Sequence, residues 1–174
     1  MLLTSYTREF SRPDCRPEAQ TIHCIAHLDQ DVGCALPYLN AVLGGVVFIA
    51  EPTTVSFKVQ GKLITVQARK IAVNALADAE EADRILAWLQ REINSAWERR
   101  EEITPLYKAA PQPQVFEILK LLPKSNCGKC GLAGCMVFAA QAAEGGRGVE
   151  HCPELDGEQR AKLAGYLGRF RFDF

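Results

Sequence analysis

The sequence predicts an α+β protein, in which an N-terminal domain with an antiparallel hairpin sheet and a long packed helix precedes a small helical module. Three observations predict this arrangement. Residues 55–67 alternate apolar and polar side chains on either side of a short turn, as paired strands do. Residues 79–101 carry apolar side chains at helical spacing. A group of cysteines is crowded into the last part of the chain, where short helices are expected.

Composition narrows the class of protein. The chain has 174 residues, of which 48% are hydrophobic and 24% charged, and its formal net charge is −1. Nucleic acid is not expected as a partner, because phosphate binding needs a concentrated positive surface. The longest apolar run, around residues 41–50, is far shorter than a bilayer span, and the first ten residues lack the basic start of a secretory signal. We therefore expect a cytoplasmic protein with no membrane span, whose thiols stay reduced.

The first third of the chain gives weaker signals. Residues 1–19 are polar and rich in turn-forming residues, which argues against regular structure there. The pattern predicts a strand over residues 21–28, a short helix after Asp31 and a β-rich run over residues 46–50. These elements complete the expected N-terminal domain around the hairpin.

The hairpin has the clearest strand pattern. Val55, Phe57 and Val59 alternate with polar residues, residues 60–62 supply a turn, and residues 63–67 return. One face of this pair is therefore expected to be buried.

The long helix is expected to cover that face. Asp78 and Glu81 match an acidic variant of the capping box, which places the helix start at residue 79. Its apolar stripe is formed by Ala82, Ile85, Leu86, Leu89, Ile93, Ala96 and Trp97.

Prolines divide the rest of the chain. Residues 105–114 contain three prolines and are expected to form a semi-rigid linker between a domain of residues 1–104 and a module of residues 115–174. Within the module we expect short helices over residues 115–122 and 136–144. The last seven residues alternate phenylalanine with charged side chains, which suggests a terminal strand.

The module contains four cysteines with the spacing C-x2-C-x4-C-x16-C: Cys127, Cys130, Cys135 and Cys152. Three ligands on one tight loop and a distant fourth are typical of a 4Fe–4S cluster, which uses four cysteine thiolates. Zinc also binds four cysteines but prefers two C-x2-C pairs, and only one pair is present here. We favour the cluster, with zinc and plain buried thiols as the alternatives.

Glycines beside these cysteines support the same interpretation. Gly128, Gly131 and Gly134 can adopt positive φ and let the backbone approach a cluster closely, with N–H groups directed at its sulfur atoms. Cys135 is expected at the start of a helix, whose N-terminal dipole favours a bound anion.

The module also resembles a known family. The matching residues are Leu122–Gly131, Cys135, Phe138–Ala139, Gly145 and Cys152–Pro153. They resemble the 4Fe–4S domain of the corrinoid iron–sulfur protein large subunit and of the B component of the Rnf complex, over about residues 115–155. The resemblance implies one low-potential 4Fe–4S cluster that passes single electrons, held by Cys127, Cys130, Cys135 and Cys152.

Two departures limit what the resemblance carries over. Ala133 and Gly134 stand where family members often have proline before the third cysteine, which changes the stiffness of the loop but not the ligand set. The corrinoid-binding regions of the corrinoid protein have no counterpart here, so corrinoid binding is not expected of this chain.

The expected function is therefore one-electron transfer through a 4Fe–4S cluster to a redox protein partner, with a corrinoid or other metalloenzyme system as one candidate. We expect no catalytic residue, because no nucleophile–base pair or phosphate-binding loop is evident. Two alternatives stay open: a scaffold or regulatory protein stabilised by zinc or a cluster, and an accessory factor for metalloenzyme maturation or activation.

A looser collection of metal-binding residue types lies in the N-terminal domain: Cys15, His23, Cys24, His27 and Cys34. Their spacing matches no compact ligand pair, so a second metal site is a weaker hypothesis than a partly buried strand with ordinary polar positions. Free cysteines are commonly buried as small apolar residues.

Overall fold

The computed structural model describes residues 1–12, 21–59 and 61–170. Contacts divide the chain into two compact units, one made mainly of residues 1–111 and the other mainly of residues 112–173. We call them the sheet unit and the cysteine unit and describe each by itself.

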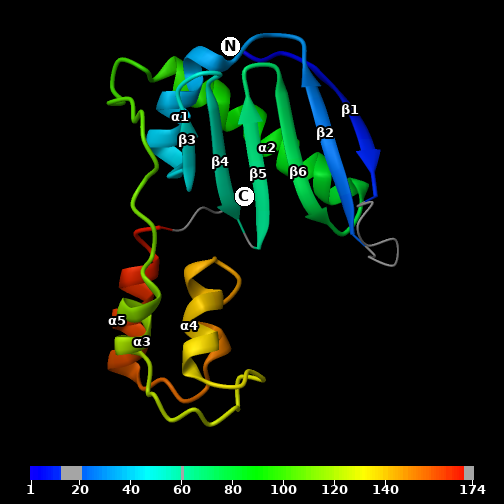
Figure 1. Ribbon diagram of the computed structural model, residues 1–174. Helices are drawn as coiled ribbons and strands as arrows, with labels where there is room; N and C mark the ends of the chain where they lie inside the picture. The colour runs from blue at the N-terminus through cyan, green and yellow to red at the C-terminus, as the bar shows by residue number, and fades with distance from the viewer. Residues whose placement is uncertain (13–20, 60, 171–174) are drawn as a thin grey trace. The chain divides into compact units, whose positions relative to one another are not determined.

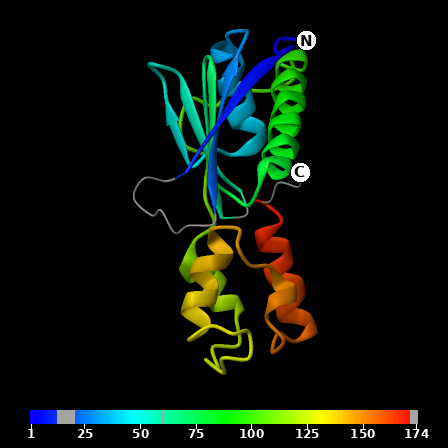
Figure 2. The same ribbon diagram turned by 90° about the vertical axis from the view of Figure 1, so that its right-hand side faces the viewer.

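The sheet unit has the expected α+β architecture. Within the described residues, six strands form one antiparallel sheet in the order β1-β2-β6-β5-β4-β3, and its two α-helices lie on one face (Figures 1 and 2). The strands are β1 Tyr6–Ser11, β2 Ile22–Leu28, β3 Val47–Ile49, β4 Thr54–Val59, β5 Lys62–Gln67 and β6 Lys70–Leu76. The helices are α1 Leu36–Leu43 and α2 Ala79–Glu98, and the 3-10 helix η1 Gly33–Ala35 leads into α1.

The predicted hairpin is confirmed, because β4 and β5 are neighbours in the sheet. Val55 and Phe57 of β4 and Ile64 and Val66 of β5 are completely buried. Alternate residues of both strands thus form the floor of the core. The third strand of this group, β6, was not expected; it pairs with β5 and β2 and contributes buried Ile71 to the same floor.

The long helix is also confirmed and covers this floor. Asp78 accepts the N–H of Glu81 at 2.7 Å, as a capping residue does, whereas the Glu81 carboxylate accepts from Ala77 at 2.8 Å rather than from Asp78. The helix ends at Glu98, three residues earlier than expected. Its buried residues are Ala82, Ile85, Leu86, Trp88, Leu89, Ile93 and Ala96.

The expectation of no regular structure near the N-terminus is wrong for residues 6–11. They form β1, which pairs with β2 over its whole length. Long-range contacts explain this: the side chain of Asn94 accepts the N–H groups of Leu2 and Leu3 at 2.7 and 2.8 Å and donates to the Leu3 carbonyl at 2.9 Å. The turn-forming residues of the expectation, 13–20, lie outside the described residues.

The proline-bearing segment is partly tied to the sheet unit. The side-chain amide of buried Asn40 donates to the carbonyls of Leu106 and Lys108 at 2.7 and 2.9 Å. The expected division into residues 1–104, 105–114 and 115–174 stays a prediction.

The cysteine unit contains the two predicted short helices, α3 Val115–Leu121 and α4 Cys135–Ala143. It also contains the 3-10 helix η2 Val149–His151 and a helix that was not expected, α5 Gly157–Leu167. Residues 171–174, most of the predicted terminal strand, lie outside the described residues. The core of the unit consists of Ile118, Leu122, Phe138, Ala139, Ala142, Cys152, Leu155, Leu163 and Leu167.

Candidate metal centre

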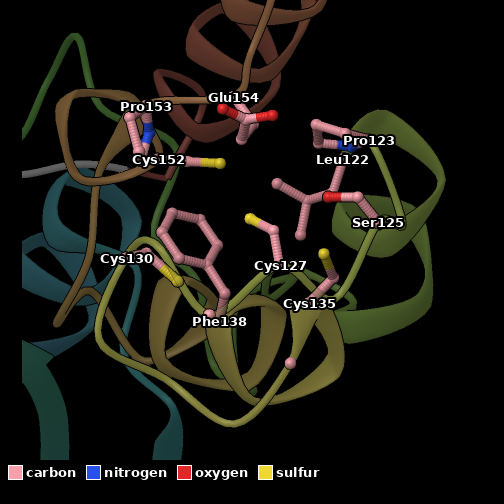
Figure 3. A pocket seen from close by; sticks show the side chains of 12 residues that line it. Leu122, Pro123, Ser125, Cys127, Cys130, Cys135, Phe138, Cys152, Pro153 and Glu154 are labelled. Atoms are coloured by element: carbon pink, nitrogen blue, oxygen red, sulfur yellow. The ribbon is translucent and has the colours of Figure 1, made fainter.

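The four cysteines of the C-x2-C-x4-C-x16-C motif line one pocket (Figure 3). Cys127 and Cys130 lie on the loop between α3 and α4, Cys135 is the first residue of α4, and Cys152 follows η2. The remaining lining residues are Leu122, Pro123, Ser125, Gly128, Gly134, Phe138, Pro153 and Glu154. Three separate stretches of the chain therefore contribute cysteines to the lining of one pocket. The role of these cysteines as ligands stays a prediction.

Two of the three glycines have the backbone conformation expected of them. Gly128 and Gly131 have φ of 70° and 80°, and the N–H of Gly131 donates to the Gly128 carbonyl at 2.9 Å. Gly134 is different, since its φ of 174° is extended backbone. An added Cβ would lie 2.9 Å from Oδ1 of Asn126, so the Asn126 side chain would have to shift to make room for it.

Cys127 is the exposed member of the set. Its sulfur accepts hydrogen bonds from the N–H of Lys129 and the hydroxyl of Ser125, which hold the pKa of the thiol below its usual range. The thiolate, which is the form that binds metal, is therefore favoured here. The backbone donor to Cys127 is thus Lys129, while the N–H of Gly131 donates to a carbonyl.

Cys152 is the buried member and belongs to the core of its unit. Burial raises the pKa of its thiol, and negative charge on Cys130 and Cys135 raises it further. The N–H groups of Glu154 and Leu155 donate to its sulfur and oppose this rise. Negative charge on these two neighbours thus disfavours ionisation of Cys152, and a bound metal would reverse this preference.

Asn126 connects the two ends of the ligand loop. Its Oδ1 accepts the N–H of Cys135 at 2.8 Å, and its own backbone is left-handed, with φ of 48°. The first residue of α4 has no cap from Gly134, so Asn126 supplies the acceptor that a capping side chain would. Sequence reasoning did not assign this role, although asparagine is one of the few residues that favour both features.

A salt bridge joins the two chain segments that carry the ligands. Nζ of Lys129 lies 2.7 Å from Oε1 of Glu154, and this contact raises the pKa of Lys129. Lys129 lies between Cys127 and Cys130, whereas Glu154 follows Cys152. Both side chains are solvent-accessible, so the pair contributes little to stability, but it joins the loop to the turn that follows η2.

The described members of the second collection of metal-binding residue types form no group that could hold a metal ion, although His23 and Cys24 line one pocket. Cys15 lies outside the described residues. Cys24 is buried in the sheet, where burial raises the pKa of its thiol, and Cys34 is exposed. His27 lies 3.3 Å from a carboxylate oxygen of Glu9.

No group of three or more His, Cys, Asp or Glu side chains converges closely enough to hold a metal ion anywhere in the described parts of the chain. That finding includes the four cysteines of the cysteine unit, which surround a pocket and do not close on one point.

Comparison with known proteins agrees with the resemblance predicted from the sequence. Residues 122–154 match a family model described as "Putative Fe-S cluster". This segment contains all four cysteines and every other residue that lines the pocket. This segment of the cysteine unit is therefore similar to iron–sulfur cluster domains.

Three relatives match part of the chain. Over 56 residues the chain is 43% identical to the gamma subunit of the acetyl-CoA decarbonylase/synthase complex of Methanothermobacter thermautotrophicus. This match covers 32% of this chain and 12% of that protein. It is 36% identical over 63 residues to the B component of the ion-translocating oxidoreductase complex of Azoarcus sp., covering 36% and 34%. It is 43% identical over 48 residues to the corrinoid/iron-sulfur protein large subunit of Moorella thermoacetica, covering 28% and 11%.

The chain thus spans about a third or less of the length of these relatives. No solved structure matches it significantly. None of the helices in the described residues is long and apolar enough to cross a membrane.

Proposed function

We propose that this protein binds one 4Fe–4S cluster through Cys127, Cys130, Cys135 and Cys152 and serves as a one-electron carrier. The observation that carries the proposal is the placement of all four thiols around a single pocket inside a segment that matches an iron–sulfur cluster model. Such a cluster, when bound, takes up and releases one electron at a potential that in proteins lies between about −700 and +450 mV.

The donor set fits a cluster better than it fits zinc. One zinc ion draws four sulfur atoms to about 2.3 Å from a single point. A cluster binds each cysteine at a different iron atom, so its ligands stand around a larger body. Here the thiols line the walls of a pocket, and the positive φ of Gly128 and Gly131 turns the loop around it.

The protein groups around the pocket suit electron transfer. Leu122, Pro123, Phe138 and Pro153 supply apolar walls that keep water away from part of the site. Hydrogen bonds from the Lys129, Glu154 and Leu155 N–H groups to sulfur stabilise negative charge on the ligands.

The exposed Cys127 marks the side on which a partner would approach, because electron transfer between proteins requires a short distance between their redox centres. We propose that the partner is a protein, since the relatives are named as subunits of a decarbonylase/synthase complex and of an oxidoreductase complex. A corrinoid system is one candidate, on the name of the third relative. Because its residues bind and insulate a cluster rather than make bonds, we propose an electron carrier that is not itself an enzyme. We propose the cytoplasm as its location, because thiols stay reduced there.

Anaerobic reconstitution with iron and sulfide tests this proposal. We expect a brown protein with about four iron and four sulfide per chain that is bleached by dithionite. Colourless protein that binds a single zinc ion would contradict the proposal and support a structural metal.

The ligand set is tested by substitution. Cys130→Ser should lower the iron content severalfold, because serine is a poor ligand for such clusters. Cys34→Ser is the matched control: it removes an exposed thiol of the sheet unit and should leave the iron content unchanged. Equal iron content in both variants would reject Cys130 as a ligand.

A further inference from the structure

Helix α5 begins three residues beyond the segment that matches the iron–sulfur model, yet it contacts the turn that carries Cys152. Arg160, on the first turns of α5, reaches back to this turn. Its Nη1 donates to the carbonyl of Val149 at 3.2 Å, and its Nη2 donates to the carbonyl of Cys152 at 3.3 Å. One guanidinium therefore spans both ends of η2.

The arrangement fixes Cys152 from two sides. The N–H groups of Glu154 and Leu155 donate to its sulfur, and Arg160 holds its carbonyl. The backbone around Cys152 is therefore restrained before and after the side chain, which limits where the sulfur can lie. A planar guanidinium holds donors on two nitrogen atoms in a fixed geometry, whereas an ammonium group has a single nitrogen whose donors rotate.

A capping box and buried side chains hold α5 in place within the cysteine unit. Asp156 and Gln159 form a reciprocal capping box at its start, with Asp156 Oδ1 accepting the Gln159 N–H at 2.7 Å. Leu163 and Leu167 are buried in the same core as Cys152. Arg160 is half-buried, so its charge is less screened than that of a surface residue.

We infer that Arg160 is a positioning residue for the fourth ligand and that α5 is part of the cluster site. This inference depends on the proposed function. It assigns Arg160 two effects: it holds Cys152 in the orientation for binding, and its positive charge favours the more negative, reduced state of the site.

The test uses the full chain, reconstituted anaerobically, as wild type and as the variants Arg160→Gln and Arg160→Lys. Both variants lose the two-carbonyl contact, whereas only the lysine variant keeps the charge. Lys162→Gln is the control, because Lys162 lies two residues further along α5, is 60% exposed and pairs with Glu158. Circular dichroism of the cluster-free chains checks that all variants keep the helix content of the wild type.

We expect both Arg160 variants to release iron to ferrozine about tenfold faster than the wild type, the usual range for loss of an outer-shell contact. The electron paramagnetic resonance spectrum of the reduced protein should change in both, and the reduction potential of Arg160→Gln should lie below that of Arg160→Lys. Lys162→Gln should behave as the wild type.

Wild-type release rates and spectra in both Arg160 variants would overturn the inference. Faster release with an unchanged spectrum and potential would also overturn it, because it would assign Arg160 to the fold of the unit alone. If the wild type itself took up no cluster, the proposed function would fail first, and this outcome is distinct from the other two.

Discussion

At the scale of single residues, Asn126 combines a backbone role and a side-chain role at the start of the ligand loop. Its φ of 48° is tolerated by asparagine and glycine but costs an alanine about 1 kcal/mol. Its Oδ1 accepts the N–H of Cys135, the third predicted ligand. Substitutions can separate these roles, since aspartate keeps the acceptor and glycine keeps only the backbone.

We expect Asn126→Gly and Asn126→Ala both to lower the iron retained after reconstitution, by about fivefold to tenfold, because Cys135 loses its restraint. Asn126→Asp should retain most of the iron. Iron and sulfide analysis after desalting measures the effect. Full retention in the glycine variant would show that the side chain does not position Cys135.

Backbone N–H groups that donate to the cysteine sulfur atoms could not be predicted from the sequence. The spacing of the four cysteines predicted that they belong to one site, because a motif of this kind is visible in the sequence itself. The backbone groups that donate to Cys127 and Cys152 were not found, because every residue except proline has an N–H and its direction depends on the folded backbone. The two-carbonyl contact of Arg160 was missed for a related reason: it requires a helix that the sequence pattern did not reveal.

At the scale of elements, the ion pair between Lys62 and Glu81 joins β5 to the first turn of α2. The two charged groups lie 3.0 Å apart, and their side chains are only 15% and 17% exposed. Burial alone would raise the pKa of Glu81, but the N–H of Ala77 and the ammonium of Lys62 outweigh it and lower the pKa. The carboxylate is therefore more stable in the folded chain than in the unfolded chain.

The sign of the pH dependence follows from that lowered pKa. Glu81 stabilises the fold at pH values above its ordinary, unfolded pKa, and the stabilisation is lost as pH falls through the lower, folded pKa. We expect Glu81→Gln to reduce the free energy of unfolding by about 1–2 kcal/mol at neutral pH. The deficit relative to the wild type should shrink as the pH falls below the ordinary carboxyl range.

Urea unfolding of cluster-free chains at several pH values measures this difference. Glu80→Gln is the control, because Glu80 is an exposed neighbour in the same turn. A deficit of Glu81→Gln that stays constant down to strongly acidic pH would contradict the assignment.

The elements themselves were predictable where local pattern and tertiary packing agree. The alternation of β4 and β5 and the stripe of α2 face one core, so the sequence pattern was sufficient. β1 was missed because its residues are mostly exposed, and it is held by pairing with β2 and by Asn94, neither of which is local. α5 was missed because few of its residues are buried, which leaves no clear helical stripe.

At the scale of the whole molecule, the two units differ in what their cores depend on. The described core of the sheet unit consists of strand and helix side chains and includes none of the four proposed ligands. The cysteine unit places Cys152 in its own core, and its four thiols face a pocket. We therefore propose that the units are separate domains and that only the second depends on the cluster for its stability.

Removing the cluster provides the corresponding test. After anaerobic chelation we expect amide hydrogen exchange in residues 112–170 to become at least about tenfold faster, which corresponds to about 1.4 kcal/mol of local stability. Exchange in residues 21–59 and 61–111 should stay the same, because their core contains none of the proposed ligands. The Cys130→Ser chain is the control and should show no change on chelation. Faster exchange in both units would show that they unfold together. Faster exchange in the sheet unit alone would mean that the metal is bound there. Either result would refute the assignment of the cluster's stabilising effect to the cysteine unit.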